Sequence, residues 1–147
     1  MKKVEATLKN IPLTLHLAES KDEKTAGYNS VPICDGEGML FRFEKPCWIP
    51  LDVSGLDGKL DAVFFINGAV NHILQRMRDQ GAIHSGYGDA ALELPGGFVA
   101  KHGIVLSDRL EIEGMVFTVE QKVNGGAESE PPQFKPEPKI ESAKRKR

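Results

Sequence analysis

The stretch LDAVFFINGAVNHILQRM, residues 60–77, predicts a β-hairpin and with it the class of the fold. Two runs of mainly apolar residues flank the pair Asn67-Gly68. Asn-Gly readily adopts the positive φ angles of a type I′ turn, whose twist matches that of two paired strands. We therefore expect residues 60–66 and 69–77 to form antiparallel strands that are closed at this turn.

Other segments show the same two-residue period. In residues 13–17, leucines alternate with polar residues, which predicts a half-buried strand with His16 on its outer face. Residues 39–43 predict another strand, and Glu113-Gly114 predicts the turn of a second hairpin. These patterns indicate a body that is mostly antiparallel β-sheet.

Helical signals are short. Ser20 followed by Glu23 forms a capping box, and Gly27 is a natural stop for the helix that it begins. A second helical turn is expected over residues 89–94, before Pro95 and two glycines break the chain. The predicted fold is α+β: a compact, mostly antiparallel sheet or barrel-like body with one or two short helices and an extended C-terminal tail.

Composition predicts an ordinary globular body without strong global electrostatics. The chain has 147 residues, of which 40% are hydrophobic and 27% charged, and its formal net charge is −2. This charge offers no broad attraction for nucleic acid or membranes. The lysines at the N-terminus are followed by polar residues rather than an apolar core, so we expect no secretory leader. A cytoplasmic or virion location is predicted.

A change of composition at Asn124 predicts a domain boundary, with a β-rich body over residues 1–123 and a tail over residues 124–147. The tail is rich in proline, and Phe134 and Ile140 are its large apolar residues, so it has little surface to bury. We expect it to dock on a protein partner or a second copy; an inert tail and, less favoured, nucleic-acid binding stay open. The residues predicted to contact a partner are Phe134, Ile140, Lys144, Arg145, Lys146 and Arg147.

Trp48 is the single tryptophan and lies in the mixed stretch GEGMLFRFEKPCWIPLD, residues 36–52. A tryptophan between two prolines can stack a ligand, but large aromatic residues are more often buried. We therefore expect Trp48 to be largely buried against Met39, Phe41 or Phe64, with a ligand-binding groove as the alternative.

Three carboxylates are candidate site residues: Asp52, Asp61 and Glu93. Two converging carboxylates can serve acid–base chemistry, whereas a carboxylate at the end of a strand more often accepts backbone N–H bonds. We favour the structural interpretation. Glu93, between Leu92 and Leu94, is the carboxylate that capping explains least.

Signatures of catalysis and metal binding are missing from the sequence. The four histidines show no spacing of three or four residues, and Cys34 and Cys47 lie in no recognisable catalytic motif. There is also no nucleophile elbow, phosphate loop or dinucleotide fingerprint. We predict no catalytic residue, no metal ligand and no cofactor.

Five segments in order resemble the uncharacterised DUF192 family, also called UPF0127. They are LHLAESKDEKTAGY from residue 15, GEGMLFRF from residue 36, LDAVFFI from residue 60, AALELPGG from residue 90 and HGIVLSD from residue 102. The resemblance implies a compact, β-rich α+β fold and no established reaction. Many bacterial members carry an export signal, which this sequence is expected to lack, whereas phage-encoded members are intracellular or virion proteins. The resemblance therefore also implies a phage-encoded member as one origin of the chain.

The chain departs from the family pattern at several motifs. Lys59-Leu60-Asp61 stands where the family has Pro-Leu-Asp, and Pro50-Leu51-Asp52 is a second match; we favour Asp61. The other departures are Gly27-Tyr28-Asn29 for Gly-Leu-Met, Trp48-Ile49 for Trp-Met, and Ser107-Asp108 for Gly-Asp.

Three functions follow as hypotheses. The favoured one is a non-enzymatic binding or assembly module, such as a phage virion component, that docks through its tail. The alternatives are a small-ligand binder and a hydrolase-type enzyme with a site near Trp48, Asp61 and Glu93. A polar-lined pocket that touches both Trp48 and Glu93 would favour the latter two.

Overall fold

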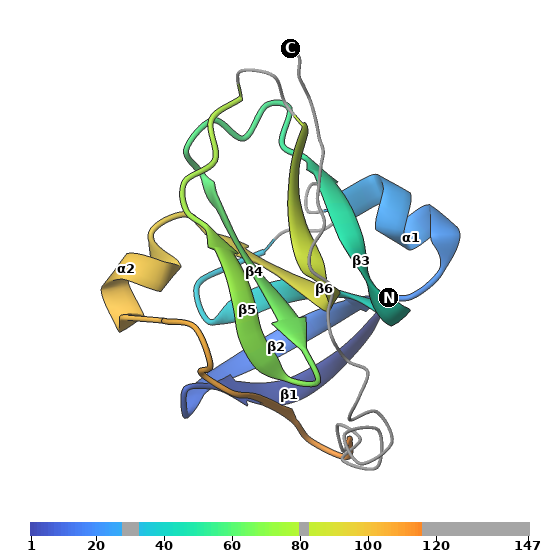
Figure 1. The fold of residues 1–147 in the computed structure, drawn as a ribbon, viewed down its shortest axis with the longest axis vertical. Coiled ribbons are helices and arrows are strands. Elements are labelled where there is room, and N and C mark those ends of the chain that lie inside the picture. The colour runs from blue at the N-terminus through green and yellow to red at the C-terminus, as the bar shows by residue number, and fades with distance from the viewer. Residues whose placement is uncertain (28–32, 80–82, 116–147) are drawn as a thin grey trace. The chain divides into compact units, whose positions relative to one another are not determined.

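A seven-stranded mixed sheet with two short helices forms the body of the protein (Figure 1). The computed structural model describes residues 1–27, 33–79 and 83–115. The strands are β1 (Lys2–Leu8), β2 (Ile11–Ala18), β3 (Glu37–Asp52), β4 (Leu60–Ile66), β5 (Ala69–Leu74), β6 (Ile83–Pro95) and β7 (Leu110–Ile112). The helices are α1 (Lys21–Ala26) and α2 (Phe98–His102).

The strand order is β5-β4-β6-β3-β2-β1-β7. The β2–β3 pair is parallel and the other named pairs are antiparallel. The predicted α+β class and mostly antiparallel sheet are therefore confirmed. Within the described residues, neither helix is long and apolar enough to cross a membrane.

The Asn67-Gly68 hairpin is confirmed. β4 and β5 pair antiparallel, and the two turn residues have φ angles of 49° and 82°. β5 ends at Leu74 rather than Met77. β4 is buried along most of its length because it pairs with β5 on one edge and β6 on the other.

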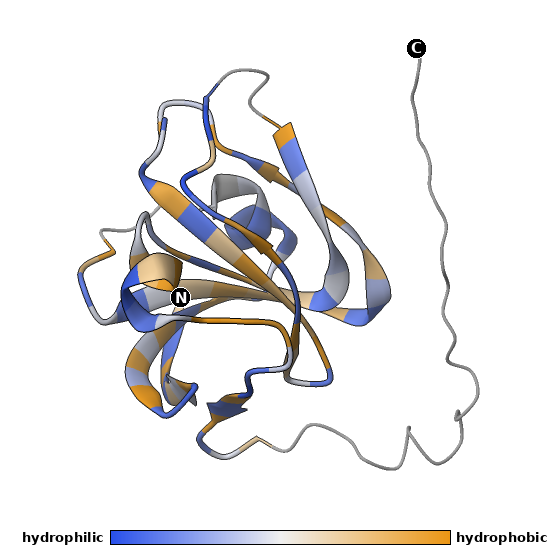
Figure 2. Cartoon of the chain, turned by 60° about the vertical axis from the view of Figure 1, so that its left-hand side comes forward, coloured by the Kyte–Doolittle hydropathy of each residue, from blue (hydrophilic) through white to orange (hydrophobic). Residues whose placement is uncertain are grey.

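β3 and β6 are long strands that curl over a shared cluster of buried apolar residues. Their register shifts between Arg42 and Cys47, which divides the pairing into two halves. An irregularity of this kind bends a strand and increases its twist. Side chains from both halves, such as Phe41 and Ile49, belong to the same buried cluster. Figure 2 shows hydrophobic and hydrophilic bands alternating along several strands, whereas β4 is buried on consecutive residues and is therefore covered on both faces.

Gly86 allows the curl to close tightly. It lies opposite Ile49 on β3, and a Cβ atom at this position would lie 2.4 Å from the ring of Phe64. No side chain fits in that space, so the first half of β6 rests directly on the core.

The first helix begins as predicted. Ser20 Oγ accepts the backbone N–H of Glu23, and the Glu23 carboxylate accepts the backbone N–H of Ser20. Gly27 follows α1 with a φ angle of 68°. The helical turn expected over residues 89–94 is wrong, because these residues pair with β3 and β4 as part of β6. Pairing on both edges outweighs local helix propensity here.

His16 is also placed differently from the prediction. Its exposed fraction is 6%, because β2 lies between β1 and β3 and both of its faces are covered from Leu15 to Ala18. The imidazole Nε2 lies 3.3 Å from a carboxylate oxygen of Glu37.

The described residues cover only part of the region for which C-terminal features are predicted. β7 pairs with β1, and Gly114 has a φ angle of 80° as a turn requires. The second strand of the predicted hairpin falls mostly on residues outside the described ranges. The compact unit that holds the described residues ends at Val116. The predicted tail from Asn124, with Phe134, Ile140 and the terminal basic run, lies outside the described residues and stays a prediction.

Candidate functional site

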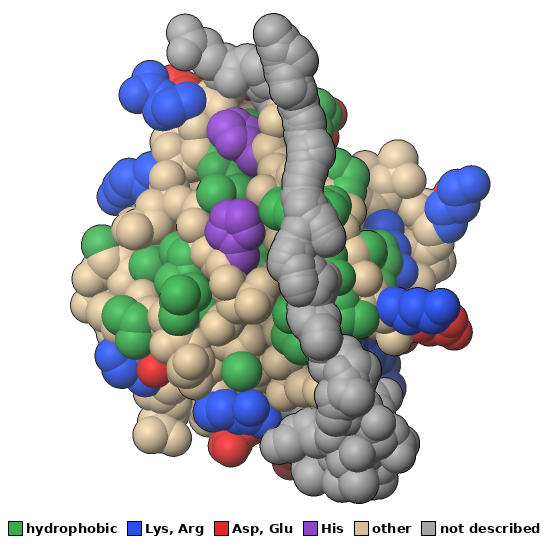
Figure 3. All heavy atoms as spheres, in the orientation of Figure 1, with side chains coloured by type: hydrophobic (Ala, Val, Ile, Leu, Met, Phe, Trp, Pro, Cys, Tyr) green, Lys and Arg blue, Asp and Glu red, His purple; other side chains and the backbone are tan. Residues whose placement is uncertain are grey.

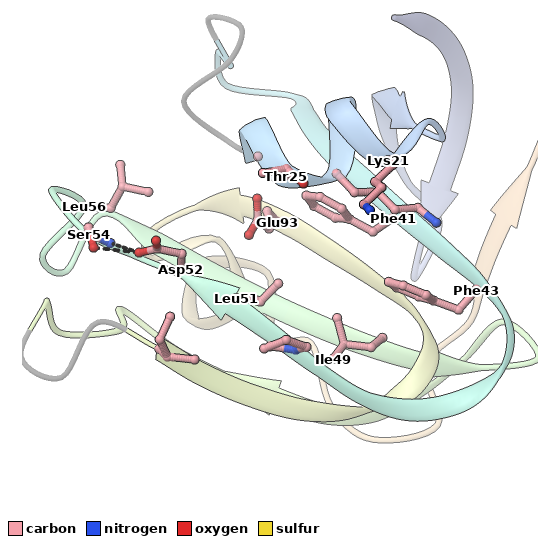
Figure 4. A pocket seen from close by; sticks show the side chains of 14 residues that line it. Lys21, Thr25, Phe41, Phe43, Ile49, Leu51, Asp52, Ser54, Leu56 and Glu93 are labelled. Atoms are coloured by element: carbon pink, nitrogen blue, oxygen red, sulfur yellow. Dashed lines mark hydrogen bonds between the residues drawn. The ribbon is translucent and has the colours of Figure 1, made fainter.

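A pocket of about 620 Å³ lies between α1 and the curled β3–β6 pair (Figure 4). Its volume falls within the range of small-molecule sites. The walls are mainly apolar. The large apolar side chains that line it are Phe41, Phe43, Ile49, Leu51, Leu56 and Ile83.

α1 forms one wall of the pocket and is anchored to β3. The Lys24 ammonium donates a 2.9 Å hydrogen bond to the carbonyl of Arg42 and lies 4.4 Å from the centre of the Phe43 ring. These contacts hold the helix beside the bent strand. Lys21, one turn earlier, also lines the pocket.

Glu93 is the buried polar residue of the pocket. It belongs to β6, its exposed fraction is 3%, and it pairs with Met39 and Ala62 across the sheet. Figure 4 shows its carboxyl group pointing into the space below α1. Among the described residues, no group is hydrogen-bonded to Glu93 Oε1. A buried polar atom without a partner is uncommon in native proteins and calls for an explanation.

Burial raises the pKa of Glu93 from its ordinary value of 4.5 to about 8. Desolvation disfavours the charged carboxylate, and the neutral acid therefore predominates in the folded protein near neutral pH. A neutral carboxyl group has one O–H donor as well as acceptor oxygens. Glu93 can thus form complementary hydrogen bonds with an amide or a carboxyl group.

Asp52 also lines the pocket, but its carboxylate forms hydrogen bonds within its own loop. One of its oxygens accepts the backbone N–H of Ser54 at 2.9 Å and the Ser54 hydroxyl at 2.6 Å. These bonds hold the pKa of Asp52 below its usual value. The structural interpretation of this carboxylate agrees with the geometry.

Asp61 is completely buried and accepts three backbone N–H groups. One oxygen accepts from Arg76 at 2.8 Å, and the other accepts from Gly97 at 3.1 Å and Val99 at 2.9 Å. This carboxylate ties β4 to the segment after β5 and to the turn before α2.

Asp61 and Glu93 do not converge. Ala62 lies beside Glu93 in the sheet, and adjacent residues of a strand point to opposite faces. Asp61 therefore lies on the other face from Glu93, and it does not line the Glu93 pocket. The hydrolase hypothesis required their convergence, and this geometry does not support it.

The prediction that Trp48 is buried is wrong. Its exposed fraction is 55%, and its ring lies 5.4 Å from that of Tyr87 and 6.4 Å from that of His72, both in edge-on geometry. Met39, Phe41, Ile49 and Leu51 alternate along β3 and face the same buried cluster, so Trp48 lies on the opposite face of the strand. That face is buried at Leu40 and exposed at Trp48. Trp48 does not line the Glu93 pocket. Figure 3 shows histidine and hydrophobic side chains close together on one face of the molecule.

Sequence reasoning identified Glu93 but missed the wall opposite it. Lys21, Lys24 and Thr25 are predicted as helical residues, yet nothing in their local pattern indicates a pocket below the helix. The described residues contain no group of three or more histidine, cysteine or acidic side chains arranged to hold a metal ion. Cys34 and Cys47 are free thiols.

Comparisons with known proteins identify a family and similar folds, and none of the matches is described with a chemical reaction. One similar solved structure is that of a "putative transcription regulator" from Sinorhizobium meliloti 1021; it is 25% identical, covers 78% of this chain and 96% of its own, and has a TM-score of 0.67. A protein of unknown function from Novosphingobium aromaticivorans DSM 12444 is 24% identical, covers 74% of this chain and 84% of its own, and has a TM-score of 0.63.

Among curated proteins, no sequence matches this chain. The family model of DUF192, described as an uncharacterized ACR family, matches residues 3–112, which include nearly all of the sheet that the structure describes. The chain therefore belongs to the DUF192 family.

Proposed function

We propose that this protein binds a small molecule in the pocket between α1 and the curled β3–β6 pair, with a polar group of the ligand at Glu93. The observation that carries the proposal is the buried Glu93 carboxyl group, which faces the pocket and has an oxygen without a hydrogen-bond partner among the described residues. Leaving such an atom unpaired costs about 1–3 kcal/mol. A ligand that supplies the partner recovers this cost.

The pocket favours an apolar ligand with one acceptor-containing polar group. Phenylalanine and aliphatic side chains make up most of its walls, which suits an aromatic or aliphatic body. The neutral Glu93 acid can donate to a carbonyl or carboxylate oxygen. Lys21 and Lys24, which also line the pocket, disfavour a cationic ligand and favour an anionic or neutral one.

Binding is favoured over catalysis by the pocket's chemistry. Among the described residues that line it there is no histidine and no cysteine; Asp52 is hydrogen-bonded to Ser54, and Lys24 donates to the Arg42 carbonyl. The described lining therefore gives Glu93 neither an imidazole nor a thiol as a partner for acid–base work. The S. meliloti structure carries the description "putative transcription regulator"; the net charge of −2 of the whole chain gives no reason to extend that role to this protein through DNA binding. The virion or assembly role expected from the sequence stays a prediction.

Three phenyl compounds of similar size test the proposal: benzamide, benzoate and benzylamine. Each would be titrated into the ¹⁵N-labelled full chain and followed by amide chemical shifts. We expect benzamide or benzoate to shift the amides of Phe41, Ile49 and Leu51 in a saturable manner. Benzylamine should bind more weakly, because its ammonium group approaches two lysines.

A matched pair of variants locates the site. Glu93→Leu keeps a side chain of similar volume without the polar group and should abolish the preference for benzamide over toluene. Trp48→Ala, on the exposed face, should leave binding unchanged. Shifts confined to Trp48, His72 and Tyr87 would move the ligand site to that face, and no saturable shift with any of the three compounds would contradict the proposal.

A further inference from the structure

We propose a second binding site, independent of the Glu93 pocket, in which Arg76, Lys101 and His102 bind a phosphate group. These three side chains line a separate cavity of about 550 Å³ next to the Pro95-Gly96-Gly97 turn and α2. Asp35 is the acidic side chain that lines the cavity, so basic groups predominate. A concave surface with this charge balance concentrates anions.

Arg76 has an unusual backbone conformation. Its φ angle is 46°, in the left-handed region that costs a residue with a side chain about 1–2 kcal/mol. The buried Asp61 carboxylate accepts the Arg76 N–H at 2.8 Å and stabilises this conformation. Strain of this kind, sustained by a buried partner, occurs most often at functional sites.

The arginine side chain then lies over a glycine. A Cβ atom on Gly97 would lie 2.5 Å from Arg76 Nη2, so the guanidinium at the end of this side chain lies directly against the glycine. Asp61 also accepts the Gly97 N–H, at 3.1 Å. The same carboxylate therefore positions both the arginine backbone and the surface on which its side chain rests.

The guanidinium retains donors for a ligand. In the part of the chain that the structure describes, its hydrogen bond is a long one of 3.3 Å, from Nη1 to the Gly58 carbonyl. A guanidinium has five N–H donors, and its fork geometry matches two oxygens of a phosphate group. Most of its hydrogen-bonding capacity is therefore available towards the cavity.

α2 supplies two further donors. Lys101 is exposed, and the His102 ring packs on Phe98 with a centroid distance of 4.4 Å, which limits its orientation. Together with Arg76 they approach the cavity from two separate segments. A phosphate monoester carries three strong acceptor oxygens and a charge of about −1.5 to −2, whereas a carboxylate has two oxygens and a single charge, so donors from several directions gain more from phosphate. This arrangement favours phosphate over carboxylate.

The test is a titration of the ¹⁵N-labelled full chain with inorganic phosphate, at an ionic strength held constant with sodium chloride. We expect saturable amide shifts at residue 76 and over residues 97–102, and none around Glu93. Phenyl phosphate forms a second arm. Tighter binding of the ester than of the free anion indicates a phosphomonoester ligand, and equal binding indicates phosphate itself; both support the site.

Arg76→Gly removes the guanidinium and suits the observed backbone, because glycine adopts a positive φ angle without strain. The variant should keep or raise its thermal midpoint while phosphate binding weakens by at least about tenfold, the loss of one strong charge-assisted contact. Lys101→Gln should weaken binding by a smaller factor. Arg78→Gln is the matched control, since it removes one positive charge from a residue outside the cavity lining.

Three results would overturn the site. The first is unchanged phosphate binding in Arg76→Gly. The second is an equal loss in Arg78→Gln, which would reduce the effect to general surface charge. The third is an absence of saturable shifts with both phosphate compounds, whatever the outcome of the benzamide experiments at the Glu93 pocket.

Discussion

Asp61 and Glu93 are two buried carboxyl groups in neighbouring strands of one sheet, and they differ in their partners. Asp61 accepts three backbone N–H groups, whereas Glu93 Oε1 has no partner within the described residues. Their exposed fractions, 0% and 3%, are nearly the same. Burial alone therefore does not distinguish a structural carboxylate from one available to a ligand; the hydrogen-bond partners do.

The difference has opposite consequences for stability. Asp61 connects three backbone segments, so its hydrogen bonds contribute to holding the fold together. Glu93 is desolvated without compensation, so its ionisation works against the folded state. Substitutions at the two positions test this contrast. Changes at the exposed Trp48 and in the tail test whether less buried parts of the chain contribute less to stability.

Replacing Asp61 should have the largest effect. Asp61→Ala leaves three N–H groups without an acceptor, and at about 1–3 kcal/mol for each unsatisfied group the free energy of unfolding should fall by about 3–9 kcal/mol. Asp61→Asn keeps one acceptor oxygen and should lose less. Urea denaturation followed by circular dichroism measures both. A loss below about 1 kcal/mol in Asp61→Ala would remove the contrast with Glu93.

Glu93 should make stability fall with increasing pH. Its pKa is about 8 in the folded protein and near 4.5 when unfolded. Between these values the unfolded chain has lost the proton and the folded chain retains it, so raising the pH favours unfolding. The contribution is fully present below about pH 4.5 and is lost as the pH rises through about 8, at no more than about 1.4 kcal/mol per pH unit.

Glu93→Gln resembles the neutral acid and should lack this dependence. We expect the stability difference between the variant and the parent to widen in favour of the variant as the pH rises from 5 to 8. Urea denaturation at each pH gives the free energy of unfolding of both proteins. The histidines contribute equally to both, so their pH dependence cancels in the difference. Parallel curves for the two proteins would show that Glu93 is ionised in the folded state.

Trp48→Ala should have a modest effect on stability. A buried tryptophan would cost about 3–5 kcal/mol on truncation, but this side chain is 55% exposed and makes edge contacts with two rings, so we expect about 1 kcal/mol. Trp48 is the single tryptophan, so its fluorescence reports directly on its surroundings. Blue-shifted emission and a large loss of stability would restore the buried interpretation.

Deleting residues 124–147 should have the smallest effect on the body. Phe134 and Ile140 are the large apolar residues of this segment, too few to form a core of their own. We expect an unchanged thermal midpoint together with weaker self-association or partner capture, measured by calorimetry and by sedimentation. A matched variant, Phe134→Ser with Ile140→Ser, should reproduce the loss of association. A marked drop in the midpoint would show that the tail packs on its own body.

Local signals in the sequence were sufficient where all of the determining residues lie close together. The Asn67-Gly68 hairpin depends on the φ angles of two adjacent residues, and the Ser20–Glu23 capping box depends on four consecutive ones. The fold class followed from these signals and from the family resemblance. Glu93 was singled out because no local cap explained a carboxylate between two leucines.

Non-local pairing determined the rest. The face of β3 that carries both Leu40 and Trp48 is buried at Leu40 and exposed at Trp48. Pairing with β3 and β4 makes residues 89–94 a strand rather than a helix. The sequence by itself determined the turns, the helix cap and the α+β class, because short-range backbone geometry governs these features. It also marked Glu93 as a candidate site residue. Only the tertiary structure decided that Asp61 and Glu93 face opposite sides of the sheet, because the relative facing of residues on two strands depends on the register in which the strands pair.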